Sequence, residues 1–276
     1  MSTSLKGVDQ ARKALADGRP SLVWRQVVAD TETPVGAALK LFCEGRGDFL
    51  LESVEGGDVR GRYSLMGLDP DLVFRATGDR AEINRDWQND HHAFHACEGG
   101  TLENLRALVE SCRCDVPGEL PPALACLVGH FGYETIGLVE KLPRPPHGEL
   151  DLPDMLFVRP TVLLVFDRLS DALFCVAPVW DELAMELAGE RIDDVLRKLA
   201  QQLPPSANTV TDHPDPSLAP TMSAADYEAM VLKAQDYISA GDIFQVVLSQ
   251  REGWTSAFFR FRVWGFVIRS SLLAFR

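Results

Sequence analysis

The sequence predicts an α+β protein, mainly an antiparallel sheet with flanking helices. The clearest sign is a pair of apolar segments, 162–166 and 172–176, separated only by the polar turn at 167–171. Strands joined so closely pair in the antiparallel sense, because a parallel crossover needs about a dozen residues or more. Segments with helical spacing of apolar residues lie on either side, at 101–113 and 182–202, and we expect these helices to flank the sheet.

Composition narrows the functional classes. The 276 residues suit one large or two ordinary domains. The net charge of −13 argues against a nucleic-acid-binding protein, which needs clustered Lys and Arg. The longest apolar stretch before residue 250, around 161–166, is far shorter than the roughly 20 residues of a membrane span. We expect a cytoplasmic protein whose six cysteines are free thiols, since no secretory leader pattern and no C-x-x-C pair is found.

The first elements follow from local signals. Residues 21–28 read as a strand, and a helix is expected to begin at Pro34 with Thr33 as its N-cap, since proline suits the first helical position. Further strands are expected at 49–53, 63–68 and 72–76, with Asp69-Pro70 separating the last two.

The segment from residue 49 to 62 suggests a ligand site. Glu52 and Ser53 place a carboxylate and a hydroxyl directly after an apolar run, and Arg60 and Arg62 follow among glycines. A small amino acid can bind such groups through its ammonium and carboxylate. The alternative is a solvated hairpin end with a surface ion pair, and the residue pattern alone favours this alternative.

Histidines give weaker signals. His91 and His95 have the i, i+4 spacing that places two metal ligands on one helix face. Their Asn-, Asp- and Gly-rich surroundings instead indicate a surface loop, and no second ligand cluster accompanies them, so no metal site is predicted. His130, near Tyr133 and Glu134, suggests acid/base chemistry, but a locally satisfied core histidine is the favoured interpretation.

Residues 203–251 are expected to form a linker followed by a helix and a strand-forming segment. Residues 203–222 are proline-rich and form the expected linker between domains. A helix is then expected from the Ser223 cap to Gly241, and strand-forming residues follow to Arg251. The apolar residues expected to form the buried stripe of this helix are Tyr227, Met230, Val231, Ala234 and Ile238.

Three stretches, taken together and in order, resemble the family of anthranilate synthase component I. They are FLLESVEGG with GRYSLMGLDPDLVFR, the G-x-F-G-Y region with VEKLP and LPDMLFVRPTVLLVFD, and YEAMVLKAQDYISAGDIFQVVLSQR. The resemblance covers about residues 20 to 250. It is specific because LLES, GRYS and AGDIFQVVLSQR occur in combination. His130 stands where these proteins often have Tyr.

The resemblance implies an α+β fold whose N-terminal domain packs against a chorismate-utilising domain, of which residues 223–251 would be the start. In the family, the LLES segment contributes to a feedback site for L-tryptophan. The corresponding residues here are Glu52 and Ser53, with Arg62 as a basic partner. The resemblance therefore favours the ligand interpretation over the hairpin-end interpretation.

The family reaction is the amination of chorismate by ammonia, followed by loss of pyruvate to leave anthranilate in tryptophan biosynthesis. The ammonia comes from glutamine through a glutamine amidotransferase subunit (component II), and Mg²⁺ is the cofactor. The family's chorismate-binding residues, Mg²⁺-binding glutamates and acid/base histidine lie past the AGDIFQVVLSQR stretch. We therefore expect no catalytic or metal-binding residue in this chain, and chorismate binding only if that domain is supplied.

Composition changes abruptly after Arg251. Residues 252–276 contain no Asp and no Pro but five Phe and two Trp, as an out-of-frame reading of a GC-rich gene would give. The expected organisation is an N-terminal domain at 1–202, the linker at 203–222, a truncated start of the chorismate-binding domain at 223–251 and an atypical tail at 252–276.

Three functional hypotheses follow. The first is a catalytically incomplete anthranilate synthase large subunit. The second is a non-catalytic module that binds tryptophan or the amidotransferase. The third is an aminodeoxychorismate synthase component I-like protein, because the residues that distinguish the two branches are missing here.

Overall fold

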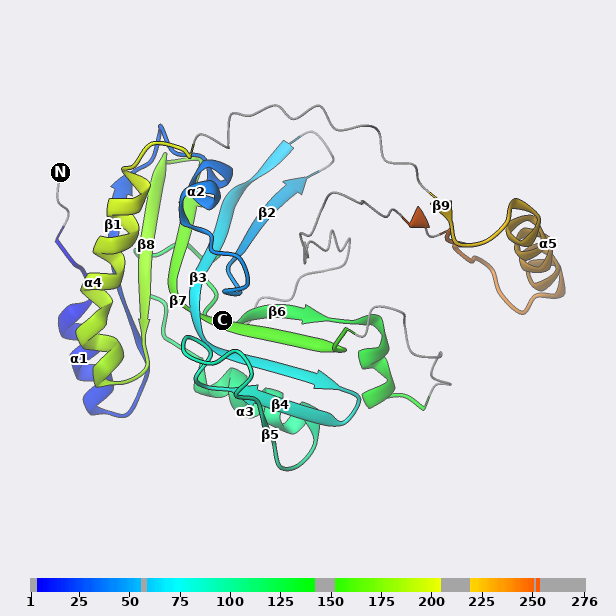
Figure 1. The fold of residues 1–276 in the computed structure, drawn as a ribbon, viewed down its shortest axis with the longest axis horizontal. Coiled ribbons are helices and arrows are strands. Elements are labelled where there is room, and N and C mark those ends of the chain that lie inside the picture. The colour runs from blue at the N-terminus through cyan, green and yellow to red at the C-terminus, as the bar shows by residue number, and fades with distance from the viewer. Residues whose placement is uncertain (1–3, 56–58, 142–151, 205–218, 251, 254–276) are drawn as a thin grey trace. The chain divides into compact units, whose positions relative to one another are not determined.

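A computed structural model describes residues 4–55, 59–141, 152–204, 219–250 and 252–253 (Figure 1). The chain divides into two compact units, a larger one that contains the described residues up to 204 and a smaller one that contains those from 219 to 253. Every one of the six cysteines is a free thiol, as expected.

The larger unit is built on one sheet in which all strand pairs are antiparallel, as the sequence predicted. The strand order is β1-β8-β7-β3-β4-β5, with β2 also paired to β3 and β6 to β7. The strands are β1 (Ser21–Val28), β2 (Phe49–Glu55), β3 (Val59–Thr77), β4 (Arg80–Asn84), β5 (His95–Ala96), β6 (Val128–Phe131), β7 (Met155–Asp167) and β8 (Ala172–Val179).

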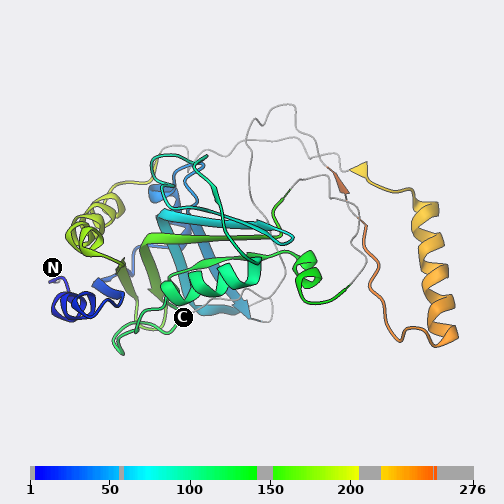
Figure 2. The same ribbon diagram turned by 90° about the horizontal axis from the view of Figure 1, so that it is seen from below.

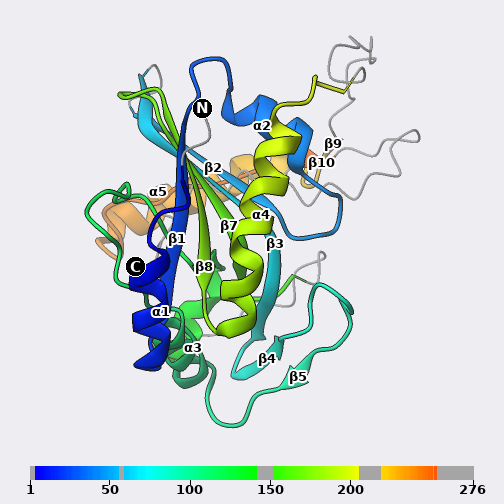
Figure 3. The ribbon, with the colours of Figure 1, turned by 90° about the vertical axis from the view of Figure 1, so that its left-hand side faces the viewer.

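Helices flank this sheet. Figure 3 shows α4 crossing one face, and Figure 2 shows α3 running along the long strands. The expected caps form: Thr33 Oγ1 accepts a hydrogen bond from Gly36 N at the start of α2, where Pro34 is the first residue. The helices of this unit are α1 (Val8–Ala16), α2 (Pro34–Leu41), α3 (Thr101–Ser111) and α4 (Glu182–Leu199), with a 3-10 helix, η1, at Tyr133–Leu138.

Buried side chains lie on both faces of the sheet because neighbouring strand residues point in opposite directions. Met66 joins the cluster beneath α4, which includes Ile192, whereas Leu65 joins the cluster on the other face. A third cluster, around Phe157 and Leu105, packs α3 against β7 and neighbouring strands. The apolar residues of the sheet are thus covered on both faces, which accounts for their near-continuous apolar character in the sequence.

One prediction about the strands is wrong. Residues 63–68 and 72–76 are not separate strands but parts of the single 19-residue β3. Asp69-Pro70 is a register irregularity within this strand, where Pro70 lies opposite Pro160 and Leu72 lies opposite Arg159. A β-bulge of this kind accommodates a residue that cannot donate a ladder hydrogen bond, so proline bends the strand without ending it.

The smaller unit contains α5 (Ala224–Ala240), with β9 (Ala219–Pro220) paired to β10 (Glu252–Gly253). Ser223 Oγ accepts the expected capping hydrogen bond from Asp226 N, and Gly241 ends the helix at φ 82°. The predicted buried stripe does not form, since no residue of α5 is buried. Residues 242–250 form no strand either, because no described neighbour pairs with them.

Several predictions about organisation stay untested. Residues 205–218 of the expected linker and 254–276 of the expected tail lie outside the described residues, so the domain boundaries and the out-of-frame origin of the tail remain predictions. No described helix has both the length and the apolar character that crossing a membrane requires.

Candidate functional site

The predicted ligand residues lie on the paired strands β2 and β3. Glu52 is opposite Ser64, and the register then shifts before Val54 pairs with Arg60. Ser53 lies at this shift, and its side chain is outside what the structure describes. Arg62 lies within this irregularity on β3, and its guanidinium lies over the ring of Tyr63, 4.8 Å from the ring centroid. Glu52 contacts Ser64, and the side chains of Ser64 and Tyr63 leave opposite faces of the sheet.

Arg62 is anchored by the turn between β7 and β8. Its Nε and Nη2 donate to Asp167 Oδ1 and Oδ2, each at 2.7 Å. Asp167 also accepts hydrogen bonds from Leu169 N at 3.1 Å and Ser170 Oγ at 2.9 Å. The hydrogen bonds from Arg62 are the main reason that the pKa of Asp167 falls from 3.8 to about 2. The pair is fixed in a bidentate geometry.

Glu52 is oriented by the same turn. Its Oε1 accepts a hydrogen bond from Arg168 Nη2 at 3.1 Å and one from Ser64 Oγ at 3.4 Å. An ion pair therefore exists at this hairpin, as the alternative hypothesis expected, but the partner of Glu52 is Arg168 rather than an arginine of the hairpin itself.

Each of these anchored groups keeps unused hydrogen-bonding capacity. Among the described residues, no hydrogen bond engages Oε2 of Glu52 or Nη1 of Arg62. The side chain of Arg62 is 48% exposed and that of Glu52 is 30% exposed. The β2–β3 hairpin thus carries an oriented carboxylate oxygen and an oriented guanidinium N–H, which are the groups that bind the ammonium and carboxylate of an amino acid.

Sequence reasoning missed Asp167 and Arg168, which lie more than a hundred residues after Glu52 and Arg62. Their only sequence signal was the polar turn between two apolar strands. The pairing of β3 with β7 places Tyr63 opposite Asp167 and brings this turn beside the β2–β3 hairpin.

The histidines take no part in this site. His91 lies in a turn and stacks on Trp87, with ring centroids 4.1 Å apart, while His95 lies in β5. The two do not share a helix face, and no cluster of metal-ligating side chains is found in the described part of the chain. His130 lies on β6 and hydrogen bonds to the backbone of Pro153. Burial lowers its pKa, as fits a locally satisfied histidine.

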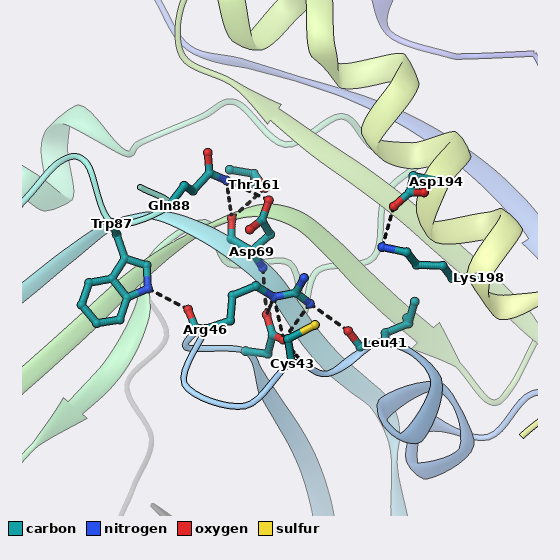
Figure 4. Close-up of polar contacts among 10 residues, drawn as sticks. Leu41, Cys43, Arg46, Asp69, Trp87, Gln88, Thr161, Asp194 and Lys198 are labelled. Atoms are coloured by element: carbon teal, nitrogen blue, oxygen red, sulfur yellow. Dashed lines mark hydrogen bonds and ion pairs between the residues drawn. The ribbon is translucent and has the colours of Figure 1, made fainter. Parts of the chain in front are cut away.

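A second candidate site, unforeseen from the sequence, is a cavity of ≈ 90 Å³ on the α4 face. It lies at the β3 bulge, and Figure 4 shows Arg46 and Asp69 from one side and Asp194 and Lys198 of α4 from the other. Its lining residues are Leu41, Arg46, Leu68, Asp69, Val162, Arg191, Asp194, Val195 and Lys198.

Comparisons with known proteins identify relatives of the chain. The model of the chorismate binding enzyme family matches residues 48–260. Anthranilate synthase component 1 of Cereibacter sphaeroides is 41% identical over 263 residues, covering 93% of this chain and 51% of the relative. The Synechocystis protein of the same name is 36% identical, covering 83% and 47%, and that of Thermus thermophilus is 37% identical, covering 81% and 46%.

A solved structure supports the fold. The crystal structure of anthranilate synthase component I from Streptococcus pneumoniae matches with a TM-score of 0.55 at 23% identity, covering 83% of this chain and 48% of that one. The α+β architecture with its mainly antiparallel sheet is therefore confirmed. The chain spans about half the length of the curated relatives that it matches.

Proposed function

Since the chain belongs to the chorismate-binding enzyme family, we propose that it functions as part of an anthranilate synthase component I. In the proposed reaction, chorismate and ammonia give anthranilate and pyruvate in tryptophan biosynthesis. The observation that carries the proposal is the family match over residues 48–260, together with the 41% identity to the Cereibacter sphaeroides protein. The aminodeoxychorismate alternative has no support among the relatives reported above.

The proposal gives this chain a binding role at the β2–β3 hairpin. Glu52, held by Arg168, accepts the ammonium of L-tryptophan, and Arg62, held by Asp167, binds its carboxylate. Ser53 is the third residue of this site by its place in the LLES stretch. Support comes from the anchoring of both charged side chains at one hairpin, which reduces the ordering cost of binding. Tryptophan bound there would act as a feedback ligand.

Ammonia delivery implies a glutamine amidotransferase subunit as the partner, and a cytoplasmic location follows from the biosynthetic role. The proposed cofactor of the whole reaction is Mg²⁺. The described residues do not fit it, since they contain no cluster of three or more side chains suited to a metal ion. No step in this chain is therefore assigned to the metal.

A complementation assay tests the proposed activity. The chain is mixed with the C-terminal half of the Cereibacter sphaeroides relative, supplied as a separate polypeptide, and anthranilate fluorescence is followed with chorismate, Mg²⁺ and ammonium. We expect fluorescence from the mixture and none from either polypeptide alone. The positive control is the relative's own N-terminal half with the same C-terminal half.

Two outcomes would differ from this expectation. Turnover by this chain alone would support the activity but contradict its dependence on the added half. No turnover in the mixture, while the control pair is active, would remove the assignment to anthranilate synthesis.

A further inference from the structure

The cavity at the β3 bulge has an apolar side and a charged side. Leu41, Leu68, Val162 and Val195 form the apolar side, and each is at most 7% exposed. The charged side contains three cationic residues and two carboxylates. Pockets that combine apolar walls with a few converging polar groups are the usual form of small-molecule sites.

Two of the cations are already neutralised. Arg46 donates from Nε and Nη2 to Asp48, at distances of 2.7–2.9 Å, and from Nη2 to the carbonyl of Leu41 at 2.8 Å. Lys198 forms a 2.7 Å ion pair with Asp194, which also accepts from Arg197 at 2.9 Å. Figure 4 shows the contact of Arg46 with Leu41 and that of Lys198 with Asp194.

Arg191 is the third cationic residue of the cavity lining. It lines the cavity from α4 and is partly buried, yet no direct hydrogen bond or ion pair joins it to any described residue. A partly buried guanidinium that makes no direct hydrogen bond is a costly arrangement, and a carboxylate is the group whose geometry matches it best.

Asp69 lines the same cavity and interacts with Arg191 through its charge, but it forms no direct ion pair with Arg191. One of its carboxylate oxygens, Oδ2, accepts a hydrogen bond from Gln88 Nε2 at 2.8 Å. Burial raises the pKa of Asp69, with Asp48 adding to the rise and Arg46, Arg191 and Lys198 opposing it. The three cationic residues of the lining outnumber its two carboxylates, so the lining is net positive even with both carboxylates ionised.

Asp69 also carries backbone strain at the cavity. Its φ is 50°, a left-handed conformation that is uncommon for a residue other than glycine. The conformation is held by hydrogen bonds from Asp69 N to Asp48 at 2.9 Å and from Thr161 Oγ1 and Gln88 Nε2 to its carbonyl, at 2.8 and 3.2 Å (Figure 4). Strain held in place from several sides is characteristic of ligand sites.

We propose that this cavity binds a short monocarboxylate, with the carboxylate on Arg191 and the aliphatic part against Leu68, Val162 and Val195. The volume of the cavity limits the size of the ligand. An apolar cavity of about 150 Å³ takes benzene, so ≈ 90 Å³ suits an acid of about two to four carbons. This site is separate from the hairpin site at Glu52 and Arg62, and it does not depend on the proposed activity.

Calorimetric titration of the full chain with sodium propionate tests the proposal, and propionamide is the neutral control of the same shape. We expect propionate to bind with a dissociation constant of about 1 mM, as suits so small a ligand, and propionamide to bind at least about tenfold more weakly. Sodium chloride at equal ionic strength should not reproduce the heat.

Two variants assign the binding to this cavity. Arg191→Gln should weaken propionate binding at least about tenfold, whereas Arg197→Gln, on the same helix but 66% exposed and outside the cavity lining, should leave it unchanged. Asp69→Asn should bind at least as tightly as the unchanged chain, since asparagine tolerates the same backbone conformation and carries no charge. Equal binding of propionate and propionamide, absence of saturable binding, or equal losses in the two arginine variants would overturn the proposal.

Discussion

The carboxylate of Asp167 holds the guanidinium of Arg62 through two hydrogen bonds of 2.7 Å, across 105 residues of sequence. This contact ties the β2–β3 hairpin to the turn after β7 and fixes the direction of the arginine proposed to bind a ligand carboxylate. Asp167 is 5% exposed, so its charge is largely removed from water and depends on these partners.

Replacing Asp167 with asparagine should therefore destabilise the chain. We expect Asp167→Asn to lower the free energy of unfolding by about 2 kcal/mol, because hydrogen bonds between charged groups are lost. Urea unfolding measures the change. The matched control is Asp17→Asn, whose ion pair with Arg19 is more than half exposed on both sides and should cost less than about 1 kcal/mol. Equal effects of the two substitutions would contradict this view of Asp167.

Because the pKa of Asp167 is lowered, we expect the stability of the chain to depend on pH. The pKa of Asp167 is lowered in the folded chain from 3.8 to about 2, so the ionised form stabilises the fold at pH above about 4. This contribution is lost as the pH falls from about 4 to about 2. The difference in unfolding free energy between the unchanged chain and Asp167→Asn should shrink over that range. A difference that stays constant down to pH of about 2 would show that Asp167 is not the titrating group.

A glycine in β6 tests the packing of the sheet. A Cβ at Gly129 would lie 2.0 Å from the carbonyl oxygen of Leu156, a backbone atom that cannot rotate away. Gly129→Ala should lower the unfolding free energy by about 3 kcal/mol or more, as expected for overpacking against a rigid strand. Gly118→Ala, where nothing lies within 4 Å of the added methyl group, is the control and should change stability by less than about 1 kcal/mol. Both values come from thermal or urea unfolding, and a tolerated alanine at 129 would refute the register of β6 against β7.

Much of the fold could be predicted because its signals are local. The strands 162–166 and 172–176, the Thr33 cap and the Ser223 cap each depend on residues close in sequence, and all were found. The strand break at Asp69-Pro70 was predicted wrongly, since the pairing of β3 with β7 overrides the local preference of proline.

The candidate sites could be predicted only in part. That Glu52 and Ser53 bind a ligand stays a prediction from the LLES resemblance. Arg168, which contacts Glu52, and Asp167, which contacts Arg62, come from a distant turn that only the sheet topology brings close. The cavity at Asp69 was not predicted because it is formed by a loop, a bulge and a helix. The prediction of a buried stripe on α5 was wrong for a related reason. Apolar spacing shows which face of a helix is suited to burial, but not whether the described chain covers that face.

Calorimetric titration of the full chain with L-tryptophan tests the proposed ligand site most directly. The comparison includes Ser53→Ala, Arg62→Gln and a control, Ser111→Ala, whose hydroxyl donates to the carbonyl of Leu108 in α3 and contacts Cys112 Sγ at 3.9 Å. We predict saturable heat for the unchanged chain and the control, with affinity reduced at least about tenfold in Ser53→Ala and Arg62→Gln. No saturable heat in the unchanged chain, or the same affinity in all four proteins, would contradict the assignment of Glu52, Ser53 and Arg62 as a tryptophan site.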